Sequence, residues 1–173
     1  VLSLVRSPIR SLHAVGLPIL SAKVDIANVR IEFESGCVAN FTASRVSTER
    51  VRKLRFFQPH QYVSIDYARQ DLLVIDVSGA AQADPAQVAA AALAGAAGLP
   101  GLNIQKPPVT AGEPLRLEIE SFLDCVRTRS APRVSGEDGR AALAVALEIN
   151  AAIMAHAKRA GLERYVRTSP GPA

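Results

Sequence analysis

Long apolar runs are the first thing that this 173-residue sequence lacks. No stretch comes near the roughly 20 consecutive apolar residues with which a helix crosses a membrane. The apolar start at Val1–Val5 is too short for the core of a secretory signal peptide. We therefore expect a cytoplasmic protein without membrane contact. With 49% hydrophobic residues, the chain can still build a sizeable core.

Cysteine is scarce, since only Cys37 and Cys125 are present. Neither residue belongs to a metal-ligating or redox-active spacing, although the two could form a single disulfide. We interpret both as buried or inert thiols, and we expect no metal site.

Catalytic patterns built on histidine or on paired carboxylates are missing as well. His13, His60 and His156 fall on an expected strand, turn and helix, and no metalloprotease or nucleophile-elbow pattern connects them. Acidic pairs such as Glu137 and Asp138 lie too close in sequence to face each other across a sugar ring. These absences argue against a free-standing hydrolase and leave no candidate catalytic residue.

A glycine-rich turn for binding a dinucleotide is absent too. The glycine cluster at Gly95, Gly98 and Gly101 has the wrong spacing, and it follows an alanine-rich run where such a turn would follow a strand. Pro100 interrupts the cluster where a helix should begin. We therefore expect no cofactor to be bound by this chain alone.

The most informative feature that is present is a predicted β-hairpin at residues 25–47. Apolar and polar residues alternate on both sides of a turn, with a period close to two. Gly36 suits that turn because glycine readily adopts a positive φ. The hairpin carries Thr42, Ser44 and Arg45 at its far end.

The order of the expected elements is strands first and helices last. We expect a mixed α/β fold of the α+β type, with one open, predominantly antiparallel mixed sheet of about six to seven strands and two long helices on one face. The strands expected beside the hairpin are Arg10–Leu20, Arg52–Phe57, Tyr62–Tyr67, Leu72–Val77 and Asn103–Val109, and the helices are Glu113–Thr128 and one that is capped by Ser135 and ended by Gly161.

Each long helix is predicted to bury one face. Ser135 can cap the second helix, and the acidic residues that follow it suit the positive end of the helix dipole. The residues predicted to be buried are Leu115, Ile119, Phe122, Leu123 and Val126 on the first helix, and Leu143, Leu147, Ile149, Ile153 and Met154 on the second.

The predicted domain covers residues 1–160. Two segments, one inserted in this range and one after it, are predicted not to pack with it. Residues 78–101 consist mostly of alanine, glycine and glutamine, whose side chains bury little apolar area, so we expect a flexible insertion in which Pro85–Ala97 could form a marginal helix. The end of the chain, residues 161–173, is predicted to be a disordered tail.

Three segments together resemble the C-terminal half of Gfo/Idh/MocA-type NAD(P)-dependent oxidoreductases. They are DIANVRIEFESGCVANFTASR in the hairpin, LRFFQPHQYVSIDY at residues 54–67, and SGEDGRAALAVALEI at residues 135–149. The resemblance spans roughly residues 1–155. The hairpin is most similar to the branch of the family that acts on UDP-N-acetylglucosamine.

The resemblance also implies parts that are not found in this sequence. Members of the family have an N-terminal Rossmann domain, a Glu-Lys-Pro motif with a catalytic lysine, and an Asp-x-x-x-His pair. The implied function is therefore that of the C-terminal half of a sugar or nucleotide-sugar dehydrogenase, which forms a substrate wall and a subunit contact. Such a half is expected to be inactive alone, with NAD or NADP bound by the intact enzyme.

The candidate substrate-binding residues lie at the far end of the hairpin. By the resemblance, Thr42 and Ser44 are candidates for hydrogen bonds to sugar hydroxyls, and Arg45 is a candidate for pairing with a phosphate or carboxylate. The alternative is that all three are ordinary polar residues at a strand end.

Basic residues are scattered, and the net charge is only +4. One cluster could be a solvated surface, could meet the diphosphate of a nucleotide-sugar, or could bind nucleic acid. Nucleic acid is the least favoured, because the neighbouring aromatic residues lie in hydrophobic strands that predict core. The cluster comprises Arg45, Arg50, Arg52, Lys53 and Arg55.

The expected sheet has apolar residues on both faces, and the two helices can cover only one of them. We therefore expect the open face to pack on a second copy of the chain or on the missing domain of the parent enzyme. A standalone dimerising module is the alternative to a part of a dehydrogenase.

Overall fold

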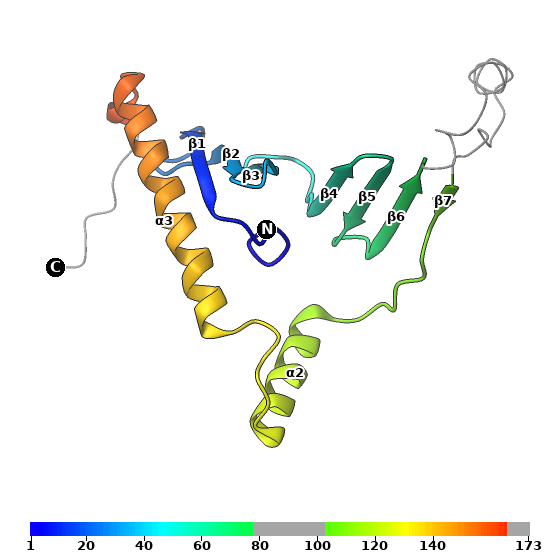
Figure 1. Cartoon of the computed structure of the whole chain (residues 1–173). Helices are drawn as coiled ribbons and strands as arrows, with labels where there is room; N and C mark the ends of the chain where they lie inside the picture. Colours follow the sequence, from blue (N-terminus) through cyan, green and yellow to red (C-terminus); the bar gives the residue numbers. More distant parts are fainter. Residues whose placement is uncertain (78–102, 166–173) are drawn as a thin grey trace, which may run out of the picture. The chain divides into compact units, whose positions relative to one another are not determined.

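A computed structural model describes residues 1–77 and 103–165 (Figure 1). The chain divides into two compact units, Val1–Thr48 with Ile119–Ala173, and Glu49–Glu118. Each unit contains one antiparallel β-sheet. The predicted insertion at 78–101 and most of the predicted tail lie outside the described residues, and the single domain over 1–160 stays a prediction.

The first unit is built on a three-stranded sheet in the order β1-β2-β3. The predicted hairpin is present as β2 and β3, and Gly36 has the positive φ, 84°, that its turn requires. The strands are β1 Ile9–Leu17, β2 Ile26–Phe33 and β3 Val38–Ser44.

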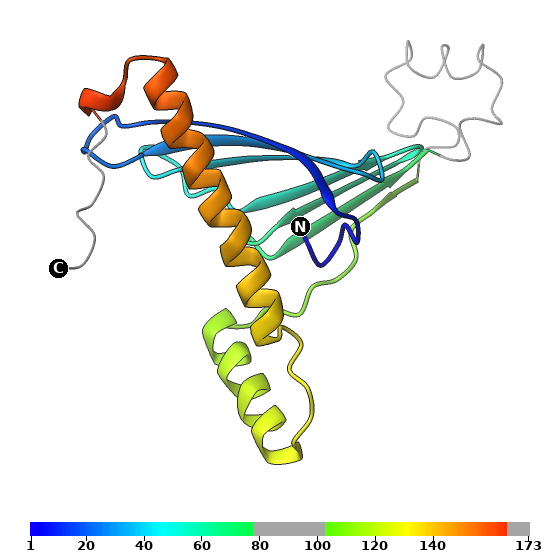
Figure 2. The same cartoon turned by 60° about the vertical axis from the view of Figure 1, so that its left-hand side comes forward.

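The core of the first unit lies between this sheet and helix α3 (Gly136–Arg159), which packs beside β1 in both views (Figures 1 and 2). Gly16 allows the close approach, because a Cβ there would lie 2.8 Å from Val24 Cγ1 and 2.9 Å from Ile153 Cγ2. The buried apolar residues of the described chain are Ala14, Val29, Ile31, Phe33, Ile153 and Ala157.

Helix α3 begins and ends as predicted, but it buries less than predicted. The Ser135 hydroxyl accepts a hydrogen bond from the Asp138 N–H, and the Asp138 carboxylate accepts one from the Ser135 N–H. Of the five residues predicted to be buried on this helix, only Ile153 is buried. Leu143 and Leu147 are each 60% exposed, because no described element covers the N-terminal part of the helix on that side.

Helix α2 (Pro114–Thr128) has no buried residue, so its predicted buried stripe is wrong for the described chain. Glu113 caps the helix, because its carboxylate accepts hydrogen bonds from the Leu115 and Arg116 N–H groups. Phe122 is 62% exposed and Val126 is 59% exposed. The apolar stripe exists, but no described strand or helix packs extensively against it.

The second unit contains a four-stranded sheet in the order β4-β5-β6-β7. Its last strand is shorter than predicted, because Pro107 and Pro108 have no N–H group to donate to a neighbouring strand. The strands are β4 Lys53–Gln58, β5 Gln61–Asp66, β6 Asp71–Asp76 and β7 Asn103–Gln105.

Gln70 joins two distant parts of the second unit. The residue has a positive φ of 53° in the turn before β6. Its side-chain Nε2 donates to the Gly112 carbonyl at 2.7 Å, and its Oε1 accepts from the Gly112 N–H at 3.2 Å. The carboxamide thus pairs with the backbone as a strand residue would.

One face of the four-stranded sheet is apolar. Directly paired residues share a face, so the register of the strands decides which side chains gather there. Six apolar side chains gather on this face, and each of them is only half-buried. No apolar residue is buried among the described residues of this unit. The six are Leu54, Phe56, Val63, Ile65, Leu72 and Val74.

The predicted mixed α/β class and the antiparallel pairing are confirmed. The seven described strands nevertheless form two sheets where one was expected, because residues 45–52 form bends and make no strand pairing between β3 and β4. The expectation of two helices on one face is met only by α3, which covers the three-stranded sheet.

Helix α3 is the one described helix that is long and apolar enough to cross a membrane, with a mean hydropathy of 1.3 over an 18-residue window. The helix is not a run of consecutive apolar residues, because Glu148 and Asn150 interrupt it. Its length and hydropathy are weak evidence for membrane insertion, because Glu148 lies in the middle of the helix and one side packs on β1.

Candidate functional site

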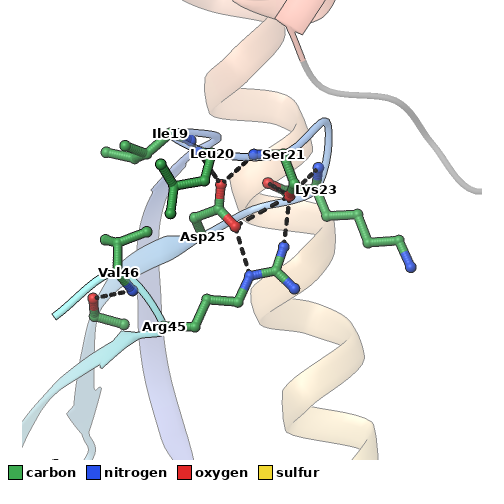
Figure 3. A network of polar contacts seen from close by, with 8 residues as sticks. Ile19, Leu20, Ser21, Lys23, Asp25, Arg45 and Val46 are labelled. Atoms are coloured by element: carbon green, nitrogen blue, oxygen red, sulfur yellow. Dashed lines mark hydrogen bonds and ion pairs between the residues drawn. The ribbon is translucent and has the colours of Figure 1, made fainter. Parts of the chain in front are cut away.

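Asp25 organises one end of the three-stranded sheet from a buried position (Figure 3). Only 4% of its surface is exposed. Its Oδ2 accepts hydrogen bonds from three backbone N–H groups of the loop between β1 and β2. The donors are Ile19 at 2.8 Å, Leu20 at 2.7 Å and Ser21 at 3.0 Å.

Arg45 completes this network. Its Nε donates to Asp25 Oδ1 at 2.6 Å, and its Nη2 donates to Ser21 Oγ at 2.8 Å. The backbone N–H groups, with the Ile19 N–H having the largest effect, hold the pKa of the Asp25 carboxyl well below its usual range. Arg45 lowers this pKa further, whereas burial opposes the shift. The predicted phosphate ligand is thus ion-paired within its own chain, while 53% of its side chain remains exposed.

The register of the hairpin could have predicted this ion pair. Ile26 pairs with Ser44, so the residues one step further from the turn, Asp25 and Arg45, lie opposite each other. Opposite charges at such a position stabilise paired strands.

Thr42 and Ser44 lie two residues apart on one face of β3 and are exposed. Thr42 Oγ1 donates to Asn28 Oδ1 at 2.9 Å, across the strand pair. Ser44 Oγ accepts from Ser47 Oγ at 2.8 Å and from the Val46 N–H at 3.3 Å. Each hydroxyl has a partner in the chain and remains open to solvent.

The face that holds Thr42 is polar over much of its area, although Val15, Leu17 and Val38 also lie on it. Arg30 donates to Glu32 at 3.2 Å and to Asn40 at 3.4 Å, and His13 lies beside Arg30 on β1. The polar residues that alternate with the apolar ones in the hairpin are the reason. A sheet with two apolar faces would need both of the alternating sets of residues to be apolar.

The predicted basic cluster is partly neutralised within the chain. Lys53 Nζ lies 3.3 Å from Asp66 Oδ2, and Arg45 pairs with Asp25. Asp66 is 9% exposed, and it also accepts hydrogen bonds from two backbone N–H groups in the turn after β5. Two of the five basic residues therefore balance buried carboxylates, which weakens the case for a nucleic-acid surface.

A cavity of about 680 Å³ lies in the first unit, beside α3 and the sheet. Thr42 is among its lining residues, whereas Ser44 and Arg45 are not. The sequence predicted His156 to be a structural or surface residue, and no motif pointed to this place. The residues that line it include Leu12, Ala14, Val29, Phe41, His156 and Arg159.

The described residues contain no group of three or more His, Cys, Asp or Glu side chains that could hold a metal ion. Cys37 and Cys125 are both free thiols in the structure. Cys37 is exposed beside the hairpin turn and Cys125 is half-buried, so Cys37 is not buried and its predicted inertness stays a prediction.

No family model matches the chain. Among curated proteins, it is similar to UDP-N-acetylglucosamine 3-dehydrogenase from Acidithiobacillus ferrooxidans, with 29% identity over 147 residues. The match covers 85% of this chain and 42% of that protein. The chain thus spans less than half the length of the relative.

Solved structures agree with this match. Two structures of UDP-N-acetylglucosamine 3-dehydrogenase GnnA from the same organism have TM-scores of 0.73 and 0.71, at 28% and 25% identity. Each covers 89% of this chain, which corresponds to 45% and 43% of the solved chains. An aldose-aldose oxidoreductase from Caulobacter crescentus shares the fold, with a TM-score of 0.63 at 19% identity over 90% of this chain and 42% of its own. The chain is therefore related to part of a nucleotide-sugar dehydrogenase, and its resemblance to the Gfo/Idh/MocA-type oxidoreductases is confirmed.

Proposed function

We propose that this chain is the C-terminal, substrate-binding and subunit-contact domain of an NAD(P)-dependent sugar or nucleotide-sugar dehydrogenase in the cytoplasm. The observation that carries the proposal is the relation to UDP-N-acetylglucosamine 3-dehydrogenase over 85% of the chain, together with the superposition on its structure. In the proposed enzyme, a hydride passes from a sugar carbon to NAD(P)⁺, and this domain holds the sugar.

Thr42 and Ser44 supply the proposed sugar contacts. Both hydroxyls are exposed on the same face of β3, and a hydroxyl can donate one hydrogen bond and accept two. Arg45 stays a candidate for a phosphate contact, because the bonds to Asp25 and Ser21 use two of its five N–H donors.

Exposed apolar surface supports the proposed subunit contact. The six half-buried residues on one face of the four-stranded sheet form a continuous apolar surface, and large contiguous patches of this kind mark interaction sites. The partner proposed for this face is a second copy of the chain.

Calorimetric titration of the chain with UDP-N-acetylglucosamine tests the substrate role. We expect saturable binding that a Thr42→Ala/Ser44→Ala double variant weakens, by about 0.5–1.5 kcal/mol for each lost hydrogen bond. Thr48→Ala, which removes another exposed hydroxyl of the same unit, serves as the matched control and should bind as the wild type does.

Two results of this titration, and one result of a separate titration with DNA, would contradict the proposal. They are no saturable binding of the nucleotide-sugar, equal weakening by the double variant and the control, and tight binding of generic DNA that falls steeply with salt. The chain is also expected not to bind NADH tightly, because its sequence contains no glycine-rich turn of the required spacing.

A further inference from the structure

The cavity beside α3 contains a buried polar atom that lacks a partner. His156 Nδ1 is buried and makes no hydrogen bond to any described residue. Buried polar side-chain atoms are almost always hydrogen-bonded. This nitrogen is closed to solvent, so a ligand in the cavity would meet another part of the His156 residue, which lines the cavity.

Arg159 brings positive charge to the same cavity. It lies one turn after His156, and helix residues three apart are neighbours on one face. None of the described residues that line the cavity is acidic. The guanidinium of Arg159 thus offers N–H donors without a competing carboxylate in the lining.

The end of the helix opposes an anion only weakly. The dipole places about half a negative charge at the C-terminus of a helix. Lys158 and Arg159 bring two full positive charges to the last turn. The N–H groups of Ala160 and Leu162 already bind carbonyl groups of that turn. The balance of charge favours an anion.

The wall across from α3 is apolar. Leu12, Ala14, Val29 and Phe41 belong to the face of the sheet that α3 covers, and they line the cavity. A volume of about 680 Å³ falls in the range of roughly 300–1,000 Å³ that is usual for small-molecule sites. We infer that the cavity binds an organic anion, a phosphate or carboxylate on an apolar or planar body, with the anionic group at Arg159, beside the His156 ring, and the body against Phe41.

This site goes beyond the proposed function. Of the residues proposed to contact the sugar or its phosphate, Ser44 and Arg45 do not line the cavity. Thr42 does line it, so the Arg159→Gln variant separates the two sites: it should weaken binding in the cavity and leave binding of a nucleotide-sugar at the hairpin unchanged.

Phenyl phosphate is a suitable probe, and the imidazole nitrogen resonances of the ¹⁵N-labelled chain report on its binding. We expect a saturable shift of the His156 ring nitrogens. His60, which is exposed in the turn between β4 and β5, is the matched control and should not shift. No saturable shift of His156 would overturn the inference.

Two charge variants test the role of Arg159. Arg159→Gln should weaken the binding of phenyl phosphate about tenfold or more, as expected for the loss of a charged hydrogen bond. Lys158→Gln removes a charge from the same turn, outside the cavity lining, and should change the affinity less than about twofold. Equal weakening by both variants would show only general electrostatic attraction and would overturn the site. Inorganic phosphate that bound as tightly as phenyl phosphate would overturn the role of the apolar wall.

Discussion

The two sheets follow the same sequence pattern, but only one of them has a buried core. All six buried apolar residues of the described chain belong to the first unit. The one buried residue described in the second unit is Asp66, although six apolar side chains share a face of its sheet. The difference is α3, which packs on β1.

This contrast shows that alternation predicts which face of a strand is apolar but not what covers it. Burial of apolar area contributes about 25 cal/mol per Å², so a half-buried side chain contributes less than a buried one. We expect the first unit to dominate the stability of the isolated chain, and the apolar face of the second unit to dominate its association.

The largest effect is expected from Phe33→Ala. Phe33 is 1% exposed in the core of the first unit, and its loss should cost about 3–5 kcal/mol of unfolding free energy. The matched change in the second unit, Phe56→Ala, should cost less, since Phe56 is half-buried. Urea unfolding followed by circular dichroism measures both changes. Equal losses of unfolding free energy would contradict the proposed difference between the two units.

A smaller loss is expected from Asp25→Asn. The side-chain amide places an N–H donor where the carboxylate accepts from three backbone N–H groups and from Arg45. We expect the melting temperature to fall by more than about 5 °C at neutral pH. Asp124→Asn, at a side chain that is 77% exposed, is the control and should change it little.

The pH dependence of this loss has a defined sign. The folded pKa of Asp25 lies below that of an unfolded aspartate, which is about 3.9. The unfolded state therefore binds the proton first as the pH falls, and the stabilisation that is complete above about pH 5 is lost below about pH 4. The gap in melting temperature between the wild type and Asp25→Asn should narrow progressively as the pH is lowered below about 4, and a gap that widened in acid would contradict the assignment.

A smaller effect again is expected from Gly16→Ala. The new Cβ would meet Val24 and Ile153 at less than 3.0 Å, and overpacking of this kind costs about 1–3 kcal/mol. Gly139→Ala in α3 is the control: a Cβ there has no neighbour within 4 Å, and alanine should stabilise the helix by about 0.5–1 kcal/mol. Thermal unfolding of the two variants should therefore shift in opposite directions.

The smallest effect on folding is expected from Val63→Lys, at the centre of the apolar face of the second unit. The change should cost under about 1 kcal/mol in unfolding free energy. It should nevertheless shift the chain from dimer to monomer in sedimentation experiments, because a charge would interrupt the apolar surface. A wild-type chain that stays monomeric at high concentration would show that this face does not associate.

Local structure was predictable from the sequence. Alternating apolar and polar residues and Gly36 predict the hairpin. Ser135 and Asp138, which are three residues apart, predict the start of α3. Burial was predicted less well, because the exposure of Phe122 and Leu147 depends on which elements pack nearby.

The candidate site was only partly predictable. Arg45 was identified as the residue suited to an anion, but its partner Asp25 was missed, although the register of the hairpin contains this information. His156 and Arg159 could not be identified, because the cavity exists only after α3 packs on a sheet that is more than 100 residues earlier in the sequence.

The carboxamide of Gln70 has a consequence for how this chain can vary in evolution. Its contact with Gly112 needs one donor and one acceptor on the same side chain, at a fixed distance from the backbone. Glutamate lacks the donor, lysine lacks the acceptor, and asparagine is one methylene too short. Position 70 should therefore vary little among relatives that keep this turn, even though it lies outside every candidate site. Invariance at this position would record a constraint on architecture and not on substrate.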